Sequence, residues 1–253
     1  MTLTEKTTPQ APPEAPPSRD AANWAKPVDR LSAEGVVGAG VDSVTGKRVN
    51  SPLQGFGQLW QKTFRVTLEG STMSPQEVIA IWKERFATFW PKKGRFYAPL
   101  AGIVPGEVAL LDIAPLPGAP VKFSTGVMVI YADDESFTFI SPEGHMLSGW
   151  ITFSAYRDGD VTVAQVQALE RTSDPFDELG RQAGNFSSSI SRITAFIFNP
   201  RAAHWVFMRL CRLSGISIVN RLIVSSVRFS THSSVVLGTG FVANDTFFAI
   251  KLP

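Results

Sequence analysis

The chain has 253 residues, of which 44% are hydrophobic and 18% are charged, as expected for a globular protein that buries a core. Its one cysteine, Cys211, excludes an intramolecular disulfide, and the three histidines, His145, His204 and His232, have no second cysteine to complete a structural zinc site. The net charge of +2 does not favour binding to nucleic acid, which usually requires a strongly basic surface.

The first 30 residues contain no apolar segment of the kind found in signal peptides. Acidic residues at Glu5, Glu14 and Asp20 are also unlike an organelle transit peptide. No run of 18 apolar residues occurs that would predict a spanning helix. Together with the single cysteine, these features predict a cytoplasmic protein.

Residues 1–27 contain six prolines and almost no large apolar side chain. Such a segment buries too little surface to offset its ordering entropy, so it is expected to be a disordered, Pro-rich leader. Residues 28–56 form a lead-in segment with no clear period. The first regular element is therefore expected to begin near Gln58.

A strand is predicted over residues 58–68, because apolar side chains fall on one face at a period of two, with Lys62 as the exception. A helix follows from Ser74, which can act as N-cap, with Pro75 at the first helical position and Glu77 completing a capping box. Its apolar stripe comprises Val78, Ile81, Trp82, Phe86 and Phe89.

Further strands are expected at 107–113, 121–131 and 136–140, with Asp133-Asp134 as the turn between the last two. The segment Ser141–Gly144 fits a type I turn, since serine, proline and glycine stand first, second and fourth.

The next two strands form a hairpin that is registered here on a two-residue turn at Asp158-Gly159. In this register Tyr156 faces Val161. One face of the hairpin then carries small or apolar side chains, namely Gly149, Ile151, Phe153, Ala155, Thr162, Ala164, Val166 and Ala168. Small residues beside bulky aromatic ones either leave a cavity or let a helix dock closely.

After Pro175 the pattern becomes helical, with one stripe at Phe186–Ile197 and a second helix opened by Asn199-Pro200. The tail over 216–253 is rich in Val, Ile, Ser and Phe and is expected to form two or three short strands. From residue 179 onward there are eight basic residues and one acid, a net charge of +7, which leaves −5 for the first 178 residues. This asymmetry allows contact with an anionic surface or ligand, and the alternative is that the arginines fringe a packed helix.

No cofactor is expected. The segment Gly238–Ala243 matches a dinucleotide fingerprint on paper, but only ten residues follow it, too few for the required crossover helix and strand. His145 is the one candidate for acid–base chemistry, since it lies between a turn and a strand with a roomy face. The alternative role for His145 is that of a loop histidine that satisfies nearby backbone groups.

The motif Ser141-Pro-Glu-Gly-His145-Met-Leu-Ser-Gly149-Trp-Ile-Thr-Phe153 resembles a domain of unknown function found in bacteria and plants, which is similar to START-like proteins (polyketide cyclases and birch-allergen-like proteins). Trp150 and Ile151 stand where the family has acidic residues. The resemblance covers roughly residues 57–215. It implies an α+β helix-grip fold, in which a curved antiparallel sheet wraps around a C-terminal helix and a binding cavity lies between the two.

These features predict an uncharacterised binding protein that takes a small apolar or amphipathic molecule between the sheet and the C-terminal helices. The expected pocket-lining residues, with His145 as polar anchor, are Phe139, Ile151, Phe153, Ala164, Val166, Val206, Phe207 and Leu210. Two alternatives stay open. The first is a cyclase- or hydrolase-type enzyme on the same fold that uses His145. The second is a membrane-surface or protein-interaction module formed by the basic C-terminal third.

Overall fold

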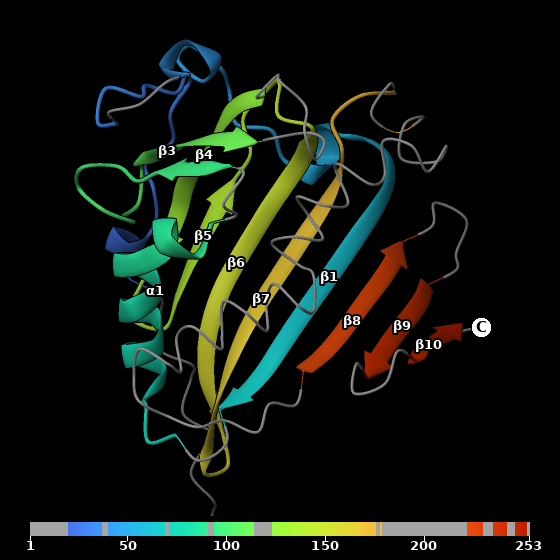
Figure 1. Cartoon of the computed structure of the whole chain (residues 1–253). Helices are drawn as coiled ribbons and strands as arrows, with labels where there is room; N and C mark the ends of the chain where they lie inside the picture. Colours follow the sequence, from blue (N-terminus) through green and yellow to red (C-terminus); the bar gives the residue numbers. More distant parts are fainter. Residues whose placement is uncertain are drawn as a thin grey trace, which may run out of the picture.

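The computed structural model is dominated by one antiparallel sheet in the order β10-β9-β8-β1-β7-β6-β5-β4-β3-β2 (Figure 1). It describes residues 20–36, 40–68, 71–90, 94–113, 123–175, 178, 222–229, 235–241 and 246–251. The strands are β1 (Phe56–Leu68), β2 (Arg95–Tyr97), β3 (Val108–Ile113), β4 (Phe123–Ala132), β5 (Ser136–Ile140), β6 (Leu147–Asp158), β7 (Val161–Thr172), β8 (Leu222–Phe229), β9 (Val235–Phe241) and β10 (Thr246–Lys251).

The strands expected at 58–68, 107–113, 121–131 and 136–140 are confirmed to within two residues at each end. Strand β2 has three residues and was not predicted, because so short a segment shows no period. Three 3₁₀ turns, η1 (Ala21–Asn23), η2 (Val41–Ser43) and η3 (Pro52–Gln54), lie in the N-terminal segment.

Helix α1 (Pro75–Phe89) begins at the predicted capping box. The Ser74 hydroxyl accepts a hydrogen bond from the Glu77 N–H at 3.2 Å, and the Glu77 carboxylate accepts one from the Ser74 N–H at 2.7 Å. Two N–H groups that the first turn leaves without helical partners are thus satisfied. The helix ends at Phe89, followed by Trp90 in an extended conformation.

The β6–β7 hairpin turns at Gly159-Asp160, so that Tyr156 pairs with Val163 and Ala155 with Ala164. The predicted turn at Asp158-Gly159 was wrong by one residue, and the predicted pairing was wrong by two. Gly159 has φ +60°, which suits it to the first central position of a tight hairpin turn. A slip of two residues keeps every side chain on its original face, so the predicted small apolar face is present.

This face, called here the inner face, packs against α1. Helix α1 contacts β2, β6 and β7, and its Trp82 and Phe86 rings meet the Phe153 ring edge-on at centroid distances of 5.5 and 5.1 Å. The rings in this group, called the aromatic cluster, are Trp82, Phe86, Phe96, Phe137, Phe139 and Phe153. Edge-to-face and offset contacts of this kind stabilise a core beyond the area that they bury.

The opposite, outer face is covered by the N-terminal segment. Leu31, Ala33, Val36 and Val44 are buried there in one cluster with sheet residues that include Leu110, Met128 and Ile140. Residues 20–27 belong to the part of the chain that the structure describes, and Trp24 forms a bridge with Tyr131 in β4. Residues 1–19 lie outside the described residues.

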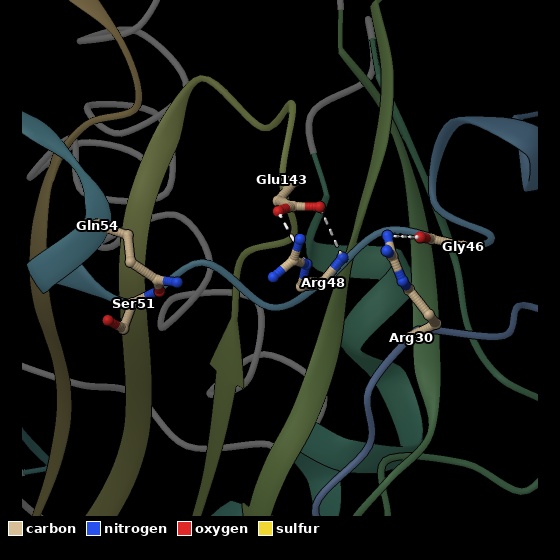
Figure 2. Close-up of polar contacts among 6 residues, drawn as sticks. All are labelled: Arg30, Gly46, Arg48, Ser51, Gln54 and Glu143. Carbon is tan, nitrogen blue, oxygen red and sulfur yellow. Dashed lines mark hydrogen bonds and ion pairs between the residues drawn. The ribbon is translucent and has the colours of Figure 1, made fainter.

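Polar contacts attach the same segment to the turn between β5 and β6. The Glu143 carboxylate accepts a hydrogen bond from the Arg48 N–H at 3.0 Å and lies 3.6 Å from the Arg48 guanidinium (Figure 2). Within the N-terminal segment itself, Arg30 donates to the Gly46 carbonyl at 2.9 Å. The turn itself is closed by a hydrogen bond of 3.1 Å from the His145 N–H to the Pro142 carbonyl oxygen. It therefore spans residues 142–145, one residue later than the predicted Ser141–Gly144 turn.

The predicted helix-grip fold is wrong. Strand β1 pairs with β7 on one side and β8 on the other, so β8, β9 and β10 extend the sheet. Helix α1, which packs on the inner face, lies between β1 and β2 in the sequence rather than at the C-terminus. The β-branched and aromatic residues of the tail favour strands. The tail therefore contributes β8, β9 and β10 to the sheet that dominates the fold. The two helices predicted over 186–213 lie outside the described residues.

Candidate ligand site on the inner face

An ion pair lies on the inner face where apolar side chains are expected. The register of β1 on β7 sets Lys62 opposite Ala168 and Trp60 opposite Glu170, so all four share one face. The Lys62 Nζ lies 2.6 Å from Glu170 Oε1, within hydrogen-bonding distance. The Lys62 side chain is 27% exposed and that of Glu170 is 9% exposed. The lysine that breaks the apolar pattern of β1 therefore has a carboxylate partner.

Small and partly exposed apolar side chains surround this pair. Ile151 of β6 lies opposite Ala168, and Gly149 lies opposite Glu170. Together with Trp60, Lys62, Leu147, Ala168 and Glu170, these residues define the polar end of the inner face. Gly149, Ala168 and Glu170 are buried, whereas Trp60, Lys62, Leu147 and Ile151 are partly exposed.

Gly149 is required by the close approach of β7. A Cβ atom at this position would lie 2.2 Å from the Leu169 carbonyl oxygen and 2.8 Å from the Glu170 Cα. Real Cβ atoms do not approach backbone atoms so closely, so any larger residue would push the two strands apart. The missing side chain of Gly149 thus allows the Glu170 backbone to lie close to β6, and this accounts for the glycine at this position of the sequence motif.

A second buried carboxylate lies beside the polar end. Glu178 is 5% exposed, and its Oε2 lies 3.2 Å from the Thr172 hydroxyl, which also lies 2.7 Å from the Phe56 carbonyl oxygen. Gly57 has φ +74°, and a Cβ atom there would lie 2.5 Å from the Glu178 carboxyl carbon. The irregular start of β1 therefore leaves room for this carboxylate.

The polar end is separate from the aromatic cluster. Phe153 pairs with Val166, which is four residues from Glu170 in β7. At roughly 3.3 Å per residue, the ion pair lies about 13 Å along the strand from the level of Phe153. The inner face is therefore a packed core at one end and a partly accessible polar surface at the other.

The structure places the expected pocket residues in different environments. Phe139, Phe153, Ala164 and Val166 are buried in the core that includes α1, whereas Ile151 is partly buried at its edge. The remaining three, Val206, Phe207 and Leu210, lie outside the described residues.

His145 is buried in a network of backbone contacts. Its Nδ1 lies 3.0 Å from the Leu147 backbone nitrogen and 3.1 Å from the Leu147 carbonyl oxygen, so the backbone two residues further on holds the ring. Its carbonyl oxygen accepts a hydrogen bond from the Ser173 hydroxyl. Burial lowers the pKa of the imidazole to about 4, so the ring is neutral near pH 7. These contacts fit a residue that organises the end of the β6–β7 hairpin.

Ser148 and Asn50 extend this network. The Ser148 hydroxyl donates to Ser173 at 3.1 Å and accepts a hydrogen bond from the Asn50 amide at 2.5 Å. Among the residues that the structure describes, no group of three His, Cys, Asp or Glu side chains could hold a metal ion. No helix in the same set is long and apolar enough to cross a membrane.

Comparisons with known proteins do not assign a family. No family model matches the chain, and a comparison with curated proteins found no match. A comparison with solved structures found the crystal structure of protein Ms6760 from Mycobacterium smegmatis, with 13% sequence identity and a TM-score of 0.34, covering 61% of this chain and 98% of that chain. The family resemblance of residues 141–153 stays a prediction.

Proposed function

We propose that the protein binds a small amphipathic molecule at the polar end of the inner face. The observation that supports this is the Lys62–Glu170 pair, which lies partly accessible among Gly149, Ile151 and Ala168. A charged pair beside small apolar side chains offers a ligand both an orienting polar contact and an apolar surface. The cytoplasmic location predicted from the sequence is part of the same proposal.

Stability alone is a weak reason for this ion pair. Removing two charges from water costs energy that their attraction only partly returns, so apolar replacements of buried pairs are often neutral or stabilising. A surface pair at high exposure contributes about 0–1 kcal/mol. Lys62 and Glu170 lie between these two cases, on a face whose neighbours are apolar. A binding role explains why charged residues stand at these two positions.

Native mass spectrometry of the purified protein tests the proposal through a co-purifying small molecule. Ile151→Trp fills the polar end with a larger ring, whereas Tyr156→Trp enlarges an exposed position on the outer face of the same strand. We expect an adduct on the wild type and on Tyr156→Trp, and its loss from Ile151→Trp. An adduct that persists on folded Ile151→Trp would place binding elsewhere.

The proposal does not extend to catalysis by His145. The ring is buried, and its Nδ1 is bound by the Leu147 backbone. A general base needs an accessible nitrogen within hydrogen-bonding distance of its substrate. The interaction role predicted for the basic C-terminal third rests largely on residues 179–221, which lie outside the described residues, and stays a prediction.

A further inference from the structure

We infer that the head group of the ligand is a monoanion, such as a carboxylate, that contacts the Lys62 ammonium, with the apolar chain along Gly149, Ile151 and Ala168. This inference rests on the proposed function. It adds the chemical class of the ligand and the residue that recognises it.

The first argument concerns which member of the Lys62–Glu170 ion pair a ligand from solvent can contact. The Lys62 side chain is 27% exposed, whereas that of Glu170 is 9% exposed, so the lysine is the more accessible member of the pair. An ammonium has three N–H donors and can serve several acceptors at once, whereas the carboxylate has none to offer an anion. A head group that approaches from solvent therefore meets a donor of positive charge.

The second argument is the part played by Glu170. Its Oε1 lies 2.6 Å from the Lys62 Nζ, and its backbone is held against Gly149. The carboxylate thus anchors the flexible lysine side chain before a ligand arrives, which reduces the entropy lost on binding. Its negative charge offsets that of the ammonium, and the Glu178 carboxylate lies beside this end, so a singly charged head group meets less repulsion there than a multiply charged one.

The third argument is the surface next to the ammonium. Ala168 lies directly opposite Lys62 in β7, and Ile151 lies opposite Ala168 in β6, so the apolar surface continues from the charge across two strands. A hydrocarbon chain on this surface buries apolar area, while its charged head group remains at the lysine. The site thereby offers the lysine ammonium to the anionic head group and an apolar surface to the hydrocarbon chain.

Isothermal titration calorimetry with three probes of equal chain length tests the inference. Hexadecanoate carries an anionic head group, hexadecanol a neutral one and hexadecyltrimethylammonium a cationic one, each used below its micellar concentration. We expect hexadecanoate to bind at least about tenfold more tightly than hexadecanol, because charge-assisted hydrogen bonds exceed neutral ones in strength. The ammonium probe should bind most weakly.

Variants assign this preference to Lys62. Lys62→Met should reduce hexadecanoate affinity to that of hexadecanol, whereas Lys26→Met, at an exposed position of the N-terminal segment, should change neither. Because Lys62→Met leaves the Glu170 carboxylate buried without this cation, the double variant Lys62→Met/Glu170→Gln removes both charges and keeps the test valid if the single variant does not fold.

The outcomes separate the two proposals. If hexadecanoate and hexadecanol bind equally, or the ammonium probe binds best, the anionic head group is wrong while the proposed function stands. If hexadecanoate keeps its preference in the double variant, Lys62 is not the contact. If none of the three probes binds and no adduct co-purifies, the proposed function itself fails.

Discussion

Truncation of Phe153 distinguishes a core position from a pocket wall. The sequence predicts that Phe153 lines a cavity, but its ring stacks on Phe137 at 4.8 Å and meets Trp82, Phe86 and Phe139 edge-on at 5.5, 5.1 and 5.9 Å. Phe→Ala changes in such cores cost about 3–5 kcal/mol, since both the transfer energy and the filled volume are lost. With four ring contacts, Phe153→Ala should lower the free energy of unfolding by about 4 kcal/mol.

Equilibrium unfolding in urea measures this loss as a lower midpoint at an unchanged slope. Tyr156→Ala is the matched control, because Tyr156 lies on the same strand but is 36% exposed on the outer face. It should change stability by about 0.5 kcal/mol or less. A loss below about 1 kcal/mol for Phe153→Ala, or tighter binding of an amphipathic probe, would contradict the assignment of this end of the face to the core.

Three other predictions follow from single contacts. Gly149→Ala should destabilise the protein by about 2–3 kcal/mol, because its Cβ meets the Leu169 carbonyl oxygen, and an unchanged melting temperature would count against that close approach. Ser74→Ala should cost about 1 kcal/mol by removing the N-cap of α1, and Ser74→Asp should restore most of it in the same thermal assay. The third concerns pH: folding lowers the pKa of His145 from 6.5 to about 4, so the unfolded chain takes up the proton first. The free energy of unfolding should then fall between about pH 6.5 and pH 4, by at most about 3 kcal/mol, and fall less in His145→Asn, whereas equal slopes in the two proteins would refute the assignment.

Local signals were sufficient for most individual elements. The capping box at Ser74–Glu77 was confirmed because the bonds that define it span only three residues. The hairpin face was found despite a wrong turn, because a slip of two residues preserves which side chains share a face. The fold class was predicted wrongly because it depends on how the C-terminal tail packs. The pairing of β8 with β1 is a long-range contact that no local pattern encodes.

The candidate site could be found only in part. Lys62 was visible in the sequence as a charge at an apolar position of a strand, which is a useful signal of a functional or paired residue. Its partner Glu170 was not predictable, because the two are 108 residues apart and meet only through the register of β1 on β7. Phe139 and Phe153 were correctly placed on the inner face, but the sequence did not show that α1 would pack on them.

Chemical-shift mapping on uniformly ¹⁵N-labelled protein during titration with hexadecanoate tests the central claim most directly. The account predicts that the largest backbone amide changes occur at the polar end of the inner face, at Lys62, Ile151 and Glu170, while Phe137 and Phe139 in the aromatic cluster change little. Changes concentrated at the aromatic cluster, or spread without preference over the sheet, would contradict a binding site at the Lys62–Glu170 pair.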